Sequence, residues 1–557
     1  MSPSLRRWFC ALAGLLALGC SQSATMSPVT RDAGVMPAVT RCGADNQAPL
    51  RDSDGRPSCT QVGSVATPVA GDWPDPPDGG VLPPPVFHVR SDASPAGADG
   101  SRAHPFATLA AVVGTLPEAG GTVVIARGSY LVEAPLGVRG DVVVVGAGAA
   151  AEGGTELTTP ASTIFSASGA TARLTLRNVA LRSTTPGNAA APAAAITAQS
   201  GAGVRLENVG IEQSAIGVRL LTGARLSAER LTIRRALVTG LLATDRSRCD
   251  LRDIVIRDGA GRGIDARDSH VSLHRALIHE NDGGGVLLSG STTGDAMGGA
   301  ALCTVGGPST EAGPLDCLSD AAITCNGIAG LFVQATATGA MRVVGQRLVL
   351  SGTRLIPGTP GGDGLVVQGG AACQLDPDVA TLGSGSEVVG NARMGILVQN
   401  GGSTLAMRGA MVGANAGAGL FIGNLAVVSS VTASEFAYNG GVGVAVASST
   451  ELMELRDSTI HDTRMGVLPG GTAMIGDGLS AGNATLGLVV NNELSGNPRF
   501  PGVFAATTGV VRENRGSDNG FQLYAYDSPG LVIDATNRVE GRAAGSGRPA
   551  VTTEVPR

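Results

Sequence analysis

Two aspartates, Asp245 and Asp268, have the type and spacing that acid–base chemistry requires. Each stands five residues after a glycine, Gly240 or Gly263, that opens a short apolar segment. If the two segments stack as neighbouring strands, the strand spacing places the two carboxylates about 5 Å apart. Carboxylates at that distance cleave glycosidic bonds in retaining enzymes, and paired carboxylates also bind calcium.

Asp265 and Arg267 lie close to this pair in the sequence and complete the candidate catalytic group. The commoner role of such aspartates is to cap a turn and to pair with a neighbouring arginine. The sequence therefore offers two interpretations of the group: a catalytic or calcium-binding site, or a set of turn residues held by ion pairs.

The rest of the sequence supplies no complete catalytic set. All 40 basic residues are arginine, which removes Schiff-base chemistry and any lysine base. No Cys-x-x-Cys pair occurs, so no zinc site is indicated. His270 and His274 share one side of a strand but lie about 13 Å apart, too far to bind one metal. The net charge of −6, with arginines scattered along the sequence, argues against nucleic acid as a partner.

A long-range repeat must position these residues. Gly217, Gly240, Gly263 and Gly285 are 23, 23 and 22 residues apart, and each opens an apolar strand. Two more short alternating strands, joined by a tight bend, lie between successive glycines. Three strands in a period of about 22 to 24 residues are one coil of a parallel β-helix.

An asparagine precedes the glycine by four residues in many of these periods. Stacked coils place such side chains above one another every ~4.8 Å, where they can hydrogen-bond along the rod and tolerate a left-handed bend. We therefore predict a structural ladder of Asn281, Asn326, Asn391, Asn415, Asn439 and Asn483.

The segment 86–148 has a different pattern, with a strand at 87–89, a short amphipathic helix within 105–116, and apolar strands at 122–126 and 142–145. This order resembles the N-terminal cap of bacterial right-handed β-helix proteins of the pectin-lyase-like class. The resemblance implies an all-β, single-stranded right-handed parallel β-helix with three strands per coil, a cap over 86–148 that contains the helix, a body over 149–540 and a polar tail over 541–557.

Enzymes of this class hold their substrate along the outward face of one stacked sheet. On the strands that follow the repeated glycines, the outward residues are mostly apolar, and they include the predicted binding stripe of Leu242, Leu287, Phe332, Leu397, Phe421 and Phe504. An exposed stripe of this length is unusual. Three explanations stay open: cover by the N-terminal segment or by inserted loops, a partner or ligand, or a register shifted by one residue.

The N-terminus reads as a secretory signal peptide over 1–19. The residues Leu16 to Cys20 resemble a bacterial lipobox, although Ala17 stands where Leu, Val or Ile is preferred, and the resemblance implies lipidation of Cys20 and an outer-membrane location. Residues 20–85 are Pro-rich and read as a semi-extended stalk, with packing of part of it against the body as the alternative.

In an oxidising compartment the cysteines are expected to pair. Cys42 with Cys59 and Cys303 with Cys317 each bracket a loop and are candidate disulfides, while Cys249 falls at an inward strand position. Cys325 and Cys373 are a further possible pair.

The sequence favours an exported, lipid-anchored rod that binds polysaccharide or a surface protein without catalysis. The alternative is a polysaccharide lyase or glycoside hydrolase that uses Asp245, Asp265, Asp268 and Arg267. A purely structural spacer is the third possibility. No cofactor is predicted apart from calcium in the enzymatic alternative.

Overall fold

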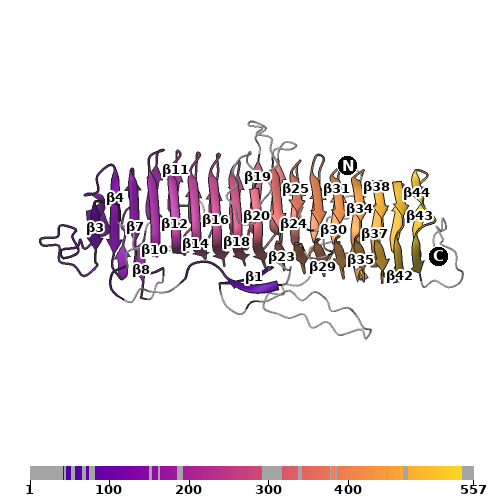
Figure 1. The fold of residues 1–557 in the computed structure, drawn as a ribbon, viewed down its shortest axis with the longest axis horizontal. Coiled ribbons are helices and arrows are strands. Elements are labelled where there is room, and N and C mark those ends of the chain that lie inside the picture. Colours follow the sequence, from indigo (N-terminus) through magenta and orange to yellow (C-terminus); the bar gives the residue numbers. More distant parts are fainter. Residues whose placement is uncertain are drawn as a thin grey trace.

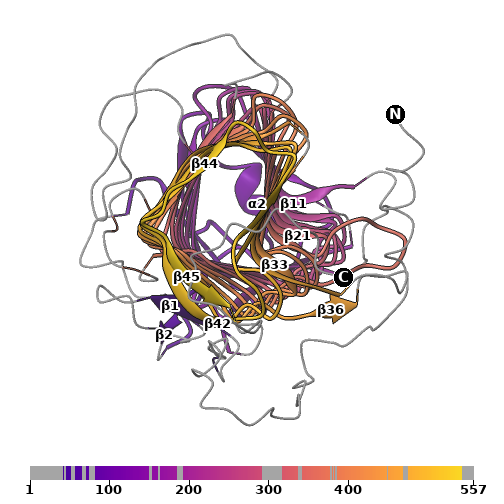
Figure 2. The same ribbon diagram turned by 90° about the vertical axis from the view of Figure 1, so that its right-hand side faces the viewer.

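The chain forms an elongated rod of stacked parallel strands in the computed structural model (Figure 1). The structure describes residues 42, 46–51, 57–65, 71–74, 82–149, 153–160, 163–184, 192–290, 316–335, 341–376, 379, 382, 385–447, 449–467 and 474–541. Seen end-on, the coils superpose on one another and enclose a common core (Figure 2). Each strand pairs in parallel with the equivalent strand of the next coil, which confirms the right-handed parallel β-helix.

Each coil contributes to three faces. Six long bent strands run through both the first and the second face: β10 (Arg173–Ser183), β12 (Gly203–Glu212), β14 (Arg225–Arg234), β16 (Arg248–Arg257), β18 (His270–His279) and β20 (Asp316–Thr324). The other strands of the first face are β3 (Val86–Val89), β4 (Gly120–Ile125), β7 (Asp141–Val145), β22 (Arg342–Gln346), β25 (Ala372–Leu375), β28 (Thr404–Arg408), β31 (Val427–Thr432), β34 (Glu451–Arg456), β38 (Thr485–Val490), β41 (Thr508–Arg512) and β44 (Leu531–Ile533).

The other strands of the second face are β5 (Gly128–Leu131), β8 (Thr155–Thr159), β23 (Val349–Ser351), β26 (Glu387–Val389), β29 (Met411–Gly413), β32 (Glu435–Ala437), β35 (Thr459–His461), β39 (Glu493–Ser495), β42 (Arg515–Asn519) and β45 (Arg538–Gly541). The third face is formed by β6 (Leu136–Val138), β9 (Phe165–Ser168), β11 (Ala194–Gln199), β13 (Ile216–Leu220), β15 (Thr239–Ala243), β17 (Arg262–Arg267), β19 (Gly284–Gly290), β21 (Ala329–Ala335), β24 (Asp363–Gln368), β27 (Ile396–Gln399), β30 (Leu420–Gly423), β33 (Gly441–Ala447), β37 (Met474–Gly482), β40 (Gly502–Ala505) and β43 (Tyr524–Tyr526), with β36 (Gly466–Val467) antiparallel to β37.

The core is one continuous apolar column inside the coils. Alternate residues of every strand point inward, as Leu226, Ala228, Leu231 and Ile233 do in β14, and these side chains are almost fully buried. Because each coil has only a few inward side chains, it is stable only when its neighbours cover both of its edges.

The asparagine ladder is present at the turn between the second and third faces. The Asn391 amide donates to Asn415 at 2.9 Å, and Asn415 donates to Asn439 at 2.9 Å. Asn281 donates to Asn326 in the same way, at 3.1 Å. All five side chains are buried, so the ladder satisfies polar groups that water cannot reach.

The prediction that Asn483 is the sixth member of the ladder is wrong. It is exposed and bonds to Ser449 at a different turn. Asn497 and Asn519 extend the ladder instead, joined by a 3.1 Å hydrogen bond. The left-handed residue is also not the ladder asparagine but the residue before it, for example Ala414 with φ 53 and Tyr438 with φ 57.

Glycine recurs at this position because the ladder asparagine of the next coil leaves no room for a side chain. A Cβ added to Gly395 would lie 2.6 Å from the Asn415 amide of the next coil, and one added to Gly419 would lie 2.7 Å from the Asn439 amide. No side chain fits there. The Asn-x-x-x-Gly pattern therefore records the contact of one coil's glycine with the next coil's asparagine.

The N-terminal end of the rod is capped. Helix α2 (Leu109–Val113) buries Leu109 and Val112 over the open end of the core, with Thr108 as its N-cap. The outer edge of β3 is also satisfied, because Phe106 accepts from the backbone of Arg90 and donates to that of His88. These contacts protect the first strand from pairing with another chain.

The described part of the predicted stalk packs on the rod. Strands β1 (Gln47–Arg51) and β2 (Pro57–Gln61) form an antiparallel hairpin that lies against the second face (Figures 1 and 2). We call Cys42 together with residues 46–51 and 57–65 the strap. The semi-extended stalk is therefore wrong for these residues, and the alternative of packing against the body is confirmed for them.

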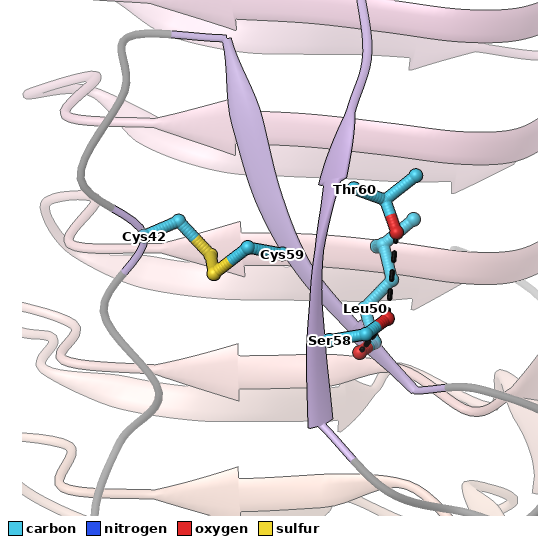
Figure 3. Close-up of a disulfide and its surroundings, with 5 residues drawn as sticks. All are labelled: Cys42, Leu50, Ser58, Cys59 and Thr60. Carbon is cyan, nitrogen blue, oxygen red and sulfur yellow. Dashed lines mark hydrogen bonds between the residues drawn. A yellow bond between two sulfur atoms is a disulfide. The ribbon is translucent and has the colours of Figure 1, made fainter.

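The predicted Cys42–Cys59 disulfide is confirmed and links the start of the strap to the middle of β2 (Figure 3). Cys249 is buried and forms no disulfide, as its inward position predicted. Cys373 is also free whereas Cys325 is disulfide-bonded, so these two do not pair with each other. Cys20 and Cys303 lie outside the described residues.

Across the described ranges, no helix is both long and apolar enough to cross a membrane.

Candidate functional site

Asp265 lies on the outward side of the third face but is not available for chemistry. Arg262 donates to it at 2.8 Å, and Arg267 donates two further hydrogen bonds of 2.8 Å. The carboxylate is only 3% exposed. Two guanidinium groups therefore occupy Asp265, and Arg267, the candidate partner in catalysis, serves as its counter-ion.

Asp245 and Asp268 stack in adjacent coils as the sequence predicts, because the Arg246 N–H donates to the Asp268 carbonyl at 2.7 Å. Both aspartates have left-handed backbone, with φ 56 and 47, and so occupy tight turns. In the part of the chain that the structure describes, no three His, Cys, Asp or Glu side chains form a metal-binding group. The turn interpretation thus accounts for this pair.

Two further buried carboxylates repeat the Asp265 arrangement and escaped the sequence analysis. Arg393 forms a two-pronged ion pair with Asp363, and Arg499 forms one with Asp477 through bonds of 2.8 Å. Both carboxylates are 1% exposed. Burial raises the pKa of Asp477 even though Arg499 opposes the shift. Their signal in the sequence is an Asp directly before Gly364 or Gly478 and an Arg in the following coil.

The predicted apolar stripe is a real column on the third face. Leu242, Asp265, Leu287 and Phe332 are in register, and the column continues through Val366, Leu397 and Phe421. Its middle is closed by its own side chains, because Val366 and Leu397 are buried against the half-buried rings of Phe332 and Phe421. The strap does not cover the stripe, since it lies on the second face.

Phe504 does not belong to the stripe. It is 0% exposed in the core, and Val503 takes the outward place, paired with Ser480. The register places Pro501, not Gly502, at the position of the repeated glycine. The error is the shift by one residue that the sequence analysis left open, confined to this coil.

A column of basic residues lies at the start of the first-face strands. Arg173, Gly203, Arg225, Arg248 and His270 are paired in register in successive coils. Arg342 holds the same place two coils further on. We call Arg173, Arg225, Arg248, His270 and Arg342 the arginine column. Six steps of ~4.8 Å make it about 29 Å long.

The arginines of this column are exposed, and those at its centre are unpaired within the described chain. Arg225 and Arg248 make no ion pair or side-chain hydrogen bond with other described residues, and Arg173 bonds only to nearby backbone carbonyls. Asp141 precedes Arg173 in the column, but no acidic residue interrupts its described members from Arg173 to Arg342. Like charges stacked on adjacent strands destabilise a sheet, so the stacked pair of Arg225 and Arg248 is unfavourable without an anion.

In the neighbouring outward columns of the first face, the positive and negative charges are closer to balance. Arg205 and Asp250 offset one another in the second column, and Arg177 pairs with Glu207 in the third. The excess positive charge of the first face is thus concentrated in the arginine column. His270 is neutral at pH 7, because burial and the charge of Arg248 lower its pKa.

A second charged cluster lies at the turn after the second face. The His461 ring contacts Asp462 at 2.9 Å through Nδ1 and Glu435 at 3.1 Å through Nε2. Burial alone would lower the pKa of His461, but the hydrogen bonds and charges of the two carboxylates outweigh burial and raise it. With both ring nitrogens engaged, His461 is held as a structural imidazolium and not as a free base.

This cluster predicts a stability contribution that depends on pH. A group whose pKa is raised in the folded state contributes its full stability at pH values below the pKa of the unfolded state, about 6.5. This contribution is lost as the pH rises through the pKa of the folded state. His461→Gln should therefore cost on the order of 1 kcal/mol at pH 6 and less at pH 8. Urea unfolding of both proteins at the two pH values checks this; an equal cost at both would contradict it.

Comparisons with known proteins identify no family model and no curated protein that match the chain. Among solved structures, the chain is similar to a GH87 alpha-1,3-glucanase catalytic domain in complex with tetrasaccharides (14% identity, TM-score 0.30, 75% of this chain and 64% of that one). It is also similar to a double mutant of the periplasmic alginate epimerase AlgG (14%, 0.31, 78% and 82%) and to the Azotobacter vinelandii mannuronan C-5 epimerase AlgE4 A-module (15%, 0.28, 84% and 100%). The chain thus spans less than two thirds of the glucanase domain. By the register of its own strands, the chain is a right-handed parallel β-helix protein.

Proposed function

We propose that the rod is an exported, lipid-anchored protein that binds an acidic polysaccharide lengthwise along the first face, without cleaving it. The observation that carries this proposal is the arginine column, in which Arg225 and Arg248 are exposed, stacked and without a described counter-ion. A carboxylated sugar chain supplies negative charges at intervals comparable with the coil spacing. Such a ligand removes the repulsion between stacked arginines and gains charge-assisted hydrogen bonds.

A non-catalytic role is supported by the state of the candidate acids. Asp265 is taken up by two arginines, and Asp245 and Asp268 lie at turns. The buried Asp363 and Asp477 are likewise held by arginine. General acid–base catalysis needs a carboxyl group within reach of the scissile bond, and these carboxylates do not offer one.

The apolar stripe on the third face is a weaker candidate for a binding surface than the arginine column. Val366 and Leu397 are buried by their neighbours, so the stripe exposes less apolar surface than its sequence predicts. The rings of Phe332 and Phe421 keep a partly exposed face, and a partner protein is the occupant that such isolated rings suit best.

The affinity of the protein for hexagalacturonate tests the proposal. Arg225→Ala with Arg248→Ala should weaken binding roughly tenfold, because each lost arginine removes a charge-assisted contact. Raising the salt concentration should also weaken wild-type binding. Arg408→Ala, an exposed arginine outside the column, is the matched control and should bind as wild type does.

Titration calorimetry gives these affinities, and ultraviolet and reducing-sugar assays on the same samples report any cleavage. Equal affinity of the double variant and the wild type would contradict the assignment of the face. Equal affinity for maltohexaose would contradict an acidic ligand, and turnover of the acidic sugar would contradict the non-catalytic role.

A further inference from the structure

The strap covers a column of apolar residues on the second face. Val255, Leu277, Ala322 and Val349 are in register in four successive coils. They point outward, yet all are 0–5% exposed because Ala48, Leu50 and Val62 of the strap pack on them. The strap thus removes from water a continuous apolar patch that the rod would otherwise expose.

Polar residues flank this apolar run in the column. Thr232, which accepts a hydrogen bond from Ser64 of the strap, precedes Val255 in register, and Glu387 follows Val349. An outward column of a β-helix is ordinarily polar, since it faces water. The four apolar residues of this column are the ones that pack against Ala48, Leu50 and Val62 of the strap, so the rod and the strap are complementary here.

The strap nevertheless adds no strand to the coils. Its strands pair only with each other, and its backbone reaches the rod through Gly63, Ser64 and Val65, which donate to Asp253, Thr232 and Asn208 at 2.9, 2.8 and 2.7 Å. A two-stranded hairpin is marginally stable on its own. None of the strap's described residues belongs to the core cluster of the rod.

The Cys42–Cys59 disulfide ties the segment before β1 to the middle of β2, across a sequence separation of 17 (Figure 3). Cross-linking restricts the conformations that a released strap can adopt, and so favours the packed state. We propose that the strap is a latch that the disulfide holds closed over the apolar column, and that without the disulfide the latch opens while the rod stays folded. This proposal is independent of the polysaccharide ligand.

Hydrogen exchange of full-length protein carrying Cys42→Ser and Cys59→Ser tests the latch. Substitution is preferable to a reductant because Cys325 is also disulfide-bonded. The amides of residues 47, 48, 50, 51 and 58–65 should exchange at least tenfold faster than in the wild type, while those of β16, β18 and β20 keep their protection. Thr60→Ala, whose hydroxyl has only a 3.4 Å contact within the hairpin, is the control and should leave both regions unchanged.

A second variant opens the latch by another route. Ala48→Asp keeps the disulfide but places a charge in the apolar contact, and it should give the same local increase in exchange. Wild-type protection of the strap in the double serine variant would show that packing alone holds it, and would overturn the proposal. Faster exchange in β16, β18 and β20 would overturn it as well, since the strap would then be part of the rod's own stability.

Discussion

Asn415→Ala is expected to destabilise the middle of the rod by about 3 to 5 kcal/mol. Asn415 accepts from the backbone and the amide of Asn391, and donates to Val388 and Asn439. Its truncation leaves several buried groups without partners, and each such group costs about 1 to 3 kcal/mol. Because coils contact only their neighbours, the damage should be local.

Hydrogen exchange resolved by segment checks this prediction. Protection should fall most in β26, β29 and β32, and much less in β10 and β12, which belong to coils before the first described member of the ladder. Asn483→Ala is a matched control, since its side chain is exposed and, among the described residues, bonds only to Ser449, and it should cost less than about 1 kcal/mol. Equal effects of the two variants would contradict a structural role for the ladder.

Asp363→Ala is expected to cost about 3 kcal/mol. The carboxylate is 1% exposed and accepts from the Arg393 side chain and from the Met394 backbone. Removal of one partner of a buried pair leaves the other charge uncompensated, and that penalty exceeds the net contribution of the pair. Adding Arg393→Ala should therefore restore part of the lost stability.

Urea unfolding of the single and double variants measures these terms. The control is Asp282→Ala, which breaks a 2.8 Å ion pair with Arg354 on a side chain that is 57% exposed, and its cost should stay below about 1 kcal/mol. A double variant that loses the sum of both single effects would contradict the uncompensated charge as the cause.

The period and the ladder could be predicted because both are written in local sequence. An asparagine four residues before a glycine reports a contact between adjacent coils, and the pattern is correct at Asn281, Asn326, Asn391, Asn415 and Asn439. It failed at Asn483. Hairpin β36–β37 extends the coil that contains His461. The motif at Asn483 therefore keeps the regular spacing in the sequence but lies outside the ladder. The true member is Asn497, four residues before Pro501.

The arginine column could not be predicted, because its members are separated by between 22 and 72 residues in the sequence and only the register brings them together. The scattered distribution of arginine along the chain is thus misleading for a stacked fold. In such a fold, a charged surface is found by following the residues stacked in one column across the coils, not the residues of one strand.

The packing of the strap left equally little signal in the sequence. Ala48, Leu50 and Val62 are small apolar residues within a polar and Pro-rich region, and they give no periodic pattern. The cysteine spacing indicated the disulfide, but the partner surface is formed by Val255, Leu277 and two further residues from distant coils. Only the three-dimensional register shows that these two sets match.

The central claim is that an acidic polysaccharide lies along the first face, and a footprint of bound hexagalacturonate tests it most directly. Carbodiimide cross-linking is unsuitable because the chain has no lysine, so arginine modification by phenylglyoxal, read by mass spectrometry, is the measurement. The account predicts that the ligand protects Arg225 and Arg248 while Arg408 and Arg512 stay reactive. Unchanged reactivity of Arg225 and Arg248 at saturating ligand would contradict it.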